Sequence, residues 1–217
     1  MRWLSYFTPT EIARFSSPFN KKIKITQYRG KKTLYVDNAE QSGGTITGMW
    51  GETIKKIRNS TLRLRSGQEF EIRNCLILGL GGGTLINILK RTYPEIEITV
   101  IEIDQVMINI AGDYFGIKSN DFLNIINADA FSWVKKNKAG KFDLIIFDLY
   151  LGTKNPVKAS NRIFLLDLKE LLDTEGSILY NRHYQNDPKD YEILKRYCQE
   201  IFKTVKLILS YPFSRIL

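Results

Sequence analysis

The spacing of hydrophobic residues changes character partway along this chain of 217 residues. In the first part, residues 22–28 and 33–37 alternate between apolar and polar side chains, which predicts two half-buried strands in a hairpin. We interpret residues 22–49 as a small antiparallel β unit, followed by an amphipathic helix over residues 51–64. Upstream, residues 10–15 are predicted to form a short helix that its first threonine can cap.

From residue 73 onward, short apolar runs alternate with stretches of helical periodicity. Strands are predicted at residues 75–78, 98–103, 123–126, 142–147, 176–180 and 204–209. Helices are predicted at residues 84–91, 105–114, 130–136, 162–172 and 191–202. This order is typical of an α/β fold with a doubly wound, mostly parallel, Rossmann-like sheet. We therefore divide the chain into an N-terminal segment with the small β unit, residues 1–60, and an α/β domain, residues 61–217.

The first apolar run of this domain leads into the glycines Gly79, Gly81 and Gly83, and the second ends in Glu102. The glycines allow a tight turn and a close backbone approach, and the following helix offers unpaired N–H groups to a ligand. Glu102 lies 19 residues after Gly83, close to the spacing of about 20 residues at which an acid binds ribose hydroxyls. The combination predicts a nucleoside site, and an ordinary glycine-rich turn is the alternative.

Other polar residues follow the remaining strands, whose carboxyl ends are where such sheets bind ligands. Glu102 can accept from two ribose hydroxyls, and Asp129, with Ala130 beside it, can accept from an exocyclic amine. Asp148 follows the fourth strand, where its carboxylate can take a proton from an amine or hydroxyl nucleophile. Tyr150 either lines the acceptor pocket or packs against the fold.

The loop also narrows the choice of ligand. A dinucleotide fingerprint would have its third small residue at position 84, which is Thr84, and no phosphate-binding lysine follows as in a Walker-type loop. The loop therefore favours a nucleoside without a pyrophosphate over NAD or ATP.

The composition, 43% hydrophobic and 25% charged, is that of an ordinary globular protein. Glycine or charge interrupts every long apolar stretch, and the N-terminus lacks the pattern of a signal peptide, so we expect no membrane partner and a cytoplasmic location. Cys75 and Cys198 do not suggest a disulfide framework. The single histidine has no companions at ligand spacing, so no metal is expected.

The net charge of +9 is unevenly distributed. Residues 1–75 hold 14 Lys/Arg and 6 Asp/Glu, whereas residues 76–217 hold 18 and 17. This favours an anionic partner at the N-terminal third, with a solvated basic face as the alternative.

The glycine loop, Glu102 and Asp129 resemble the S-adenosylmethionine site of class I methyltransferases. More closely, residues 22–211 resemble the spermidine synthase (polyamine aminopropyltransferase) superfamily. The resemblance implies a methyltransferase-like, nucleoside-binding α/β domain that uses S-adenosylmethionine or decarboxylated S-adenosylmethionine. It also implies that Gln41 binds the ligand, that Glu52 occupies a family position 11 residues later, and that Asp148 is the proton acceptor.

Several acidic positions of that superfamily are changed here. Gly82 and Leu151 stand where aminopropyltransferases have aspartates, and Thr47 replaces another acid; the aromatic–polar pair before Glu52 is Trp50-Gly51. Each lost carboxylate removes an interaction of roughly 1.5–3 kcal/mol with a cationic substrate. The resemblance therefore supports the fold and the adenosyl ligand but argues against polyamine synthesis, and places the chain in a divergent, methyltransferase-like branch.

Three functions follow. The first is a methyltransferase for an unidentified small-molecule acceptor, with Asp148 as base or acceptor anchor. The second is an aminopropyltransferase that uses decarboxylated S-adenosylmethionine, and the third is a non-catalytic adenosyl- or nucleic-acid-binding protein. Clustering of the N-terminal lysines on one face would support the third, and dispersion would weaken it.

Four further features lead to expectations. His183 follows the fifth predicted strand and either faces the cleft or is structural, Trp50 is a pocket wall or a core residue, and Asp104 is expected to cap a helix. The hairpin edge and the aromatic N-terminus are compatible with a homodimer. Since the chain stops at Leu217, the last antiparallel strand usual in this fold should be short or supplied differently.

Overall fold

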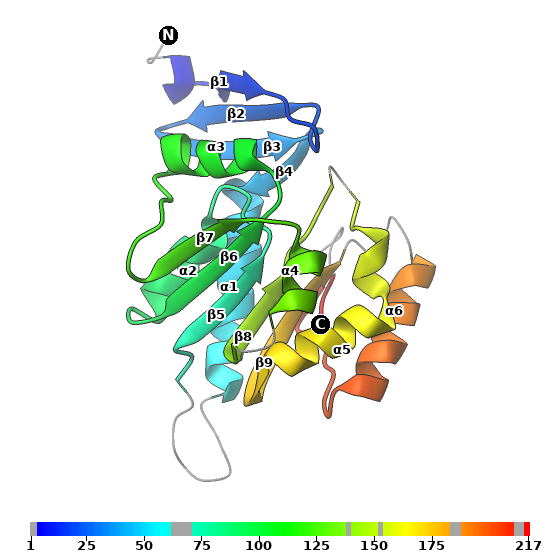
Figure 1. Ribbon diagram of the computed structural model, residues 1–217. Coiled ribbons are helices and arrows are strands. Elements are labelled where there is room, and N and C mark those ends of the chain that lie inside the picture. Colours follow the sequence, from blue (N-terminus) through cyan, green and yellow to red (C-terminus); the bar gives the residue numbers. More distant parts are fainter. Residues whose placement is uncertain (1–3, 62–70, 138–139, 152–153, 183–187, 211–214) are drawn as a thin grey trace.

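The structure, a computed structural model, contains two sheets, with helices around the larger one (Figure 1). It describes residues 4–61, 71–137, 140–151, 154–182, 188–210 and 215–217. The small antiparallel sheet has the order β1-β2-β3-β4, with bounds Thr10–Phe15, Ile23–Tyr28, Lys31–Val36 and Ala39–Ser42. The larger sheet has the order β10-β11-β9-β8-β5-β6-β7.

The strands of the larger sheet are β5 (Asn74–Leu78), β6 (Glu97–Glu102), β7 (Leu123–Asn127), β8 (Phe142–Phe147), β9 (Leu172–Arg182), β10 (Leu209–Ser210) and β11 (Arg215–Ile216). The α-helices are α1 (Gly44–Thr61), α2 (Thr84–Thr92), α3 (Gln105–Phe115), α4 (Ala130–Lys136), α5 (Arg162–Leu171) and α6 (Pro188–Ile201). Two short 3-10 helices, η1 and η2, are Leu4–Tyr6 and Val157–Ser160. No helix in these ranges is both long and apolar enough to cross a lipid bilayer.

The predicted hairpin is confirmed as β2 and β3, but two other N-terminal predictions are wrong. Residues 10–15 form strand β1, which pairs antiparallel with β2, so that a distant partner prevails over the local capping signal. Ala13 and Phe15 of this strand pack on the cluster around Ile23 and Ile25. This packing stabilises the extended conformation of residues 10–15. Residues 45–49 are helical, because α1 already begins at Gly44 and the fourth strand of the small sheet is β4.

In the α/β part the predicted strands and helices from residue 75 to residue 147 are confirmed, with small shifts of their ends. Strands β5 to β9 are parallel to one another, and the central strands β5 and β8 are mostly apolar and buried, as expected of strands covered on both faces. Toward the C-terminus the boundaries differ: β9 begins at Leu172 rather than at residue 176, and residues 204–208 form no strand. The closing strands β10 and β11 are two residues each within the described residues, and β11 runs antiparallel to β9.

Helices cover both faces of the large sheet (Figure 1). On one face α1 and α2 pack on β5 and β6, and on the other α4, α5 and α6 pack on β8 and β9. Trp50, Ile54 and Ile57 of α1 belong to the same buried cluster as Cys75 and Ile77 of β5. The predicted helix over residues 51–64 is thus part of α1, and its residues 62–64 lie outside the described ranges. The division at residue 60 stays a prediction.

Helix α3 joins the two sheets. Its residues Met107 and Ile110 pack under the small sheet, while Ala111 belongs to the core of the large one. Asp104 caps this helix, since its side chain accepts from the Val106 N–H at 3.0 Å, which confirms the capping role expected from the sequence. The same carboxylate also accepts from Ser17 Oγ at 2.5 Å and Asn20 Nδ2 at 2.8 Å, and so attaches the N-terminal segment.

Candidate functional site

The strand order reverses between β5 and β8, which makes the crevice at their carboxyl ends the switch point of the sheet. Gly79 ends β5 there with φ of +102°. A Cβ at this position would lie 2.5 Å from the Asp148 carbonyl oxygen, so the approach of the two strand ends excludes any side chain. Gly81 and Gly83 also have positive φ, and Gly83 is the N-cap of α2.

Glu102, at the end of β6, is held by the backbone of two loops. Its Oε2 accepts from the Leu80 N–H at 3.0 Å and its Oε1 from the Asp104 N–H at 2.9 Å. Burial raises the pKa of this carboxyl, and the two amide hydrogen bonds act in the opposite direction. Because an ionised carboxylate has about four acceptor sites, about two remain for the hydroxyls of a ribose.

The end of β7 supports this arrangement. Asn127 Nδ2 donates to the carbonyls of Glu102 and Ile103, at 2.9 and 3.0 Å, and fixes the turn after β6. Asp129 caps α4 by accepting from the Ser132 N–H at 2.8 Å through Oδ1, which leaves Oδ2 for a ligand. Ala130 is buried beside it.

The small sheet reaches the glycine loop through β4. Ser42 Oγ lies 2.5 Å from Thr84 Oγ1, which also accepts from the Gly43 N–H at 3.1 Å. The Gln41 carbonyl lies against Gly81, and the binding of a ligand by the Gln41 side chain stays a prediction. Glu52 is exposed on α1 and pairs with Lys56 at 2.9 Å.

Asp148 directly follows β8 and is the carboxylate that the sequence predicts on the acceptor side of the site. Its Oδ1 accepts from Asn181 Nδ2 at 2.8 Å. Burial raises the pKa of Asp148 from 3.8 to about 6, although the Asn181 amide and the Trp50 indole N–H both lower it. At neutral pH the Asp148 carboxyl is therefore ionised. Because its pKa is raised, it accepts a proton more readily than an ordinary carboxylate, as a general base requires.

The surroundings of Asp148 are poor in charge. Trp50 is 1% exposed, and its indole N–H makes no hydrogen bond of normal geometry with the described residues. It is therefore a core residue, and its role as a pocket wall stays a prediction. Tyr150 is half-buried two residues further on, and Leu151 is 48% exposed.

Position 82 is closed as well as uncharged. A Cβ on Gly82 would lie 2.8 Å from both the Cβ and the Oγ of Ser42. The hydroxyl of Ser42 is in turn fixed by Thr84. The space that an aspartate would need at this position is therefore filled by β4.

Sequence reasoning missed two residues of this site. Asn181 is buried in β9 and orients Asp148; reading the end of the fifth strand, as was done for the first four, would have found it. Ser42 closes position 82 through packing between the sheets, for which the sequence carries no local signal. His183 lies outside the described residues.

Basic residues of the small sheet differ in their surroundings. Lys24 lies over the Tyr35 ring, with its Nζ 5.0 Å from the centroid, whereas Lys32 Nζ donates to the Tyr114 carbonyl of α3 at 2.8 Å. Arg14, the partner of Lys24 on the neighbouring strand, lies on the same face as Lys24 and is bound to Glu11 through two hydrogen bonds. The nucleic-acid alternative and an anionic partner both stay predictions.

The mostly parallel sheet with helices on both faces, and with a glycine turn and Glu102 at two neighbouring strand ends, defines a doubly wound, Rossmann-like α/β domain. Comparison with known families identifies the family to which this domain belongs. Residues 56–212 match the spermine/spermidine synthase domain, and the chain belongs to this family.

The relatives include two kinds of transferase. The chain is 33% identical over 119 residues to a polyamine aminopropyltransferase of Vibrio vulnificus, which covers 54% of this chain and 40% of that protein. It is 31% identical over 117 residues to an eEF1A lysine and N-terminal methyltransferase homolog of Drosophila pseudoobscura pseudoobscura, covering 50% of this chain and 17% of that one. This chain thus aligns with less than half the length of either relative.

A solved structure confirms the fold class. Human methyltransferase-like protein 13, in complex with SAH, superposes with a TM-score of 0.64 over 80% of this chain and 81% of that chain, at 22% identity. The α/β architecture predicted from the sequence is therefore that of the methyltransferases.

Proposed function

We propose that this chain is an S-adenosylmethionine-dependent methyltransferase of the spermidine synthase family, acting on an acceptor that is not a polyamine. Three supports converge: the family match, the methyltransferases among its relatives and structural neighbours, and a crevice with an adenosyl-type cradle. At two positions where the resemblance implies acids that hold a diamine, this chain has Gly82 and Leu151.

The cofactor half of the site is assigned to residues on three strand ends. Glu102 accepts from the ribose hydroxyls, Asp129 Oδ2 from the adenine amine, and the loop from Gly79 to Gly83 lets the ligand approach the backbone. Gln41 closes the loop from β4. S-adenosylmethionine, when bound, supplies a sulfonium that carries an electrophilic methyl group.

The transfer itself needs positioning and a proton acceptor. The acceptor nucleophile forms a bond to the methyl carbon as the carbon–sulfur bond breaks, and the electron pair of that bond stays on the thioether. The proton lost by the nucleophile passes to Asp148, which Asn181 holds in place. Trp50 and Tyr150 form the walls around this position.

The closure of position 82 is the observation that carries the preference for methyl transfer. The aspartate missing at position 82 has no room there, because Ser42 fills the space where the aspartate side chain would stand. With Leu151 at the second acidic position, a diammonium substrate would enter the crevice without two of its counter-charges. Such a loss weakens binding by roughly tenfold for each 1.4 kcal/mol.

Aminopropyl transfer is the second candidate, because the Vibrio vulnificus relative is a polyamine aminopropyltransferase and Asp148 suits both reactions. The two differ in their ligand, since decarboxylated S-adenosylmethionine lacks the carboxylate of S-adenosylmethionine.

Titration calorimetry with S-adenosylmethionine, decarboxylated S-adenosylmethionine and their thioether products decides between them. We expect the carboxylated ligand to bind more tightly, and Glu102→Ala to weaken it by at least about a hundredfold, because two charge-assisted hydrogen bonds of roughly 1.5–3 kcal/mol each are lost. Glu97→Ala, at an exposed position of the same strand, is the matched control. Preference for the decarboxylated ligand would favour aminopropyl transfer, and binding of neither would contradict both.

A further inference from the structure

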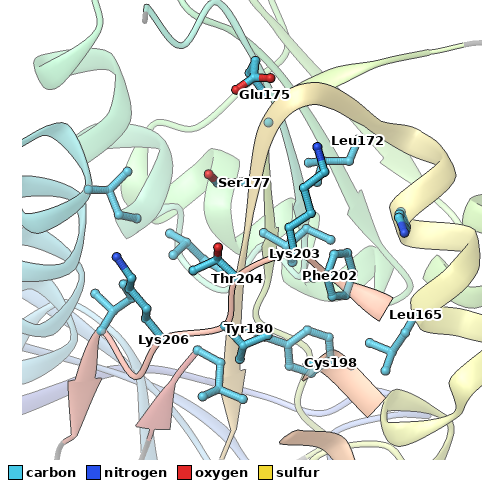
Figure 2. A pocket seen from close by; sticks show the side chains of 18 of the residues that line it. Leu165, Leu172, Glu175, Ser177, Tyr180, Cys198, Phe202, Lys203, Thr204 and Lys206 are labelled. Carbon is cyan, nitrogen blue, oxygen red and sulfur yellow. The ribbon is translucent and has the colours of Figure 1, made fainter. Parts of the chain in front are cut away.

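A cavity of about 610 Å³ is lined by residues of β9, α5, α6 and the segment that follows α6 (Figure 2). Basic and acidic side chains share its lining, among them Lys203, Lys206 and Glu175, so its charge favours no single class of ligand. None of the residues assigned to the adenosyl ligand lines this cavity. The polar contacts that bear on that ligand lie instead where the small sheet meets α3 (Figure 1).

Asp104 connects the acid assigned to the ribose with the N-terminal segment. Its backbone N–H donates to Glu102 Oε1 at 2.9 Å. Its carboxylate accepts from the Val106 N–H, from Ser17 Oγ at 2.5 Å and from Asn20 Nδ2 at 2.8 Å. Asp104 is 1% exposed, so these donors take the place of water around its charge. One residue therefore contacts both Glu102 and the segment between β1 and β2.

Residues 17–20 form a turn that presents both donors together. The Ser17 N–H donates to the Asn20 carbonyl at 2.8 Å, and Ser17 Oγ accepts from the Asn20 N–H at 2.9 Å. Because a serine hydroxyl carries one proton and two lone pairs, the Ser17 hydroxyl can close the turn as an acceptor while it donates to Asp104. Loss of this hydroxyl would therefore weaken the turn as well as the bond to the carboxylate.

The two donors matter because two buried carboxylates lie close together. Burial raises the pKa of Glu102, and the charge of Asp104 raises it further. Hydrogen bonds from Ser17 and Asn20 stabilise the charge of Asp104 and fix the orientation of its carboxylate. Without them, the Val106 N–H alone would bind this carboxylate among the described residues. A buried carboxylate with so few partners is expected to turn toward other donors, and that movement would displace the Asp104 N–H from Glu102.

We propose that Ser17 and Asn20 are positioning residues of the adenosyl site, which act through Asp104 to hold Glu102 in place for the ribose hydroxyls. The inference rests on the proposed function, because it needs Glu102 as the acceptor of those hydroxyls. It gives the turn between β1 and β2 a part in ligand binding, although this turn contacts the ligand only through Asp104 and Glu102. By linkage, a ligand bound at Glu102 stabilises the turn by the same factor by which the turn strengthens binding.

Calorimetry with S-adenosylhomocysteine compares the wild-type chain with a variant that combines Ser17→Ala and Asn20→Ala. We expect the double variant to bind about tenfold more weakly, within the range of roughly 5–150-fold typical of coupled sites. Ser17→Thr, which keeps the hydroxyl, should bind like the wild type. Lys32→Met is the matched control, because Lys32 Nζ also joins the small sheet to α3, but through the Tyr114 carbonyl near the C-terminus of that helix. It should leave the affinity unchanged.

A second ligand separates positioning from a general loosening of the fold. A 2′,3′-dideoxy analogue of S-adenosylhomocysteine lacks the hydroxyls from which Glu102 accepts, so the wild type and the double variant should bind it equally well. The reciprocal effect is measured on the wild-type chain alone, by hydrogen exchange of the Asn20 amide, which donates to Ser17 Oγ. We expect saturation with S-adenosylhomocysteine to slow this exchange by about tenfold.

The outcomes distinguish this inference from the proposed function. If S-adenosylhomocysteine binds the wild type and the double variant equally, or if Lys32→Met weakens binding as much as the double variant does, the inference is wrong and the proposed function stands. An equal loss of affinity for the dideoxy analogue, or unchanged exchange of the Asn20 amide on saturation, would overturn it in the same way. If the wild-type chain does not bind S-adenosylhomocysteine, both are wrong. Thermal melting checks that each variant is folded, and the exchange measurement needs no variant.

Discussion

The two halves of the crevice are built in opposite ways. On the adenosyl side, the carboxylates of Glu102 and Asp129 accept from backbone N–H groups of neighbouring turns. On the acceptor side, Asp148 is held by one side-chain amide, with Trp50 and the exposed Leu151 nearby. The first half is fixed by the backbone of the sheet, and the second depends on side chains that come from distant parts of the chain.

This difference indicates which half of the site can change its substrate specificity within the family. Alterations on the adenosyl side would disturb the turns themselves, so the ligand class is strongly constrained. The acceptor side can lose or gain charges without affecting a backbone hydrogen bond, and the resemblance implies that two such charges are replaced here by Gly82 and Leu151. Variants on the acceptor side are the most direct test of this difference between the two halves.

The largest effect is expected from Asp148→Asn. An amide cannot accept the proton of the nucleophile, so methyl transfer to an acceptor found by screening should fall by roughly 10²–10⁴-fold. Binding of S-adenosylhomocysteine, which depends on the other half of the crevice, should change by less than about threefold. Transfer is measured with radiolabelled S-adenosylmethionine, and binding by calorimetry. Asp121→Asn, at an exposed position, is the control, and full activity of Asp148→Asn would remove the assigned base.

An intermediate effect is expected from Gly82→Asp, which restores the family aspartate. Since the new Cβ would meet Ser42 at 2.8 Å, we expect a loss of roughly 1–3 kcal/mol in the free energy of unfolding, typical of overpacking, and no gain in diamine binding. Chemical denaturation and calorimetry with putrescine measure the two quantities. Gly48→Asp, where a Cβ meets nothing within 4 Å, is the matched control. A stable variant that binds diamines would show that the crevice accepts the aspartate after all.

The smallest effect is a pH dependence set by Asp148. Its pKa of about 6 means that kcat/KM for the nucleophile should level off above pH 7 and be about tenfold lower at pH 5. Because the folded pKa is raised, ionisation of Asp148 costs folded-state stability, and the cost develops between pH 3.8 and about 6. Asp148→Asn should therefore stabilise the fold above pH 6 and be neutral near pH 4. Denaturation at both values checks the sign, and a plateau that extends to pH 5 would contradict the raised pKa.

Much of the α/β core could be predicted because its signals are local. The apolar run of β5, the glycines after it and the acid that ends β6 lie within one βαβ unit, and each acts through its own neighbours in sequence. The helix cap at Asp104 is equally local, and the structure confirms it.

The rest depended on contacts between distant segments. The sequence predicts a helix from Thr10 where the structure has strand β1. The pairing of this strand with Gln27 and Ile23 cannot be recognised from residues 10–15 alone. Ser42 closes position 82 only because the β4–α1 turn docks on α2, and no spacing rule predicts that contact. The site assignments beyond this geometry, and the homodimer, stay predictions.

Asp104 has a consequence for the order in which the molecule is made. The hairpins of the small sheet join segments close in sequence, so they can pair soon after synthesis. The carboxylate that attaches their N-terminal flank lies 87 residues after Ser17 and 84 after Asn20. The apolar face around Ile25 and Leu34 rests on α3, which emerges from the ribosome still later. During translation this apolar face is therefore exposed until α3 has left the ribosome. A chaperone that covers it would act before residue 104 has been synthesised.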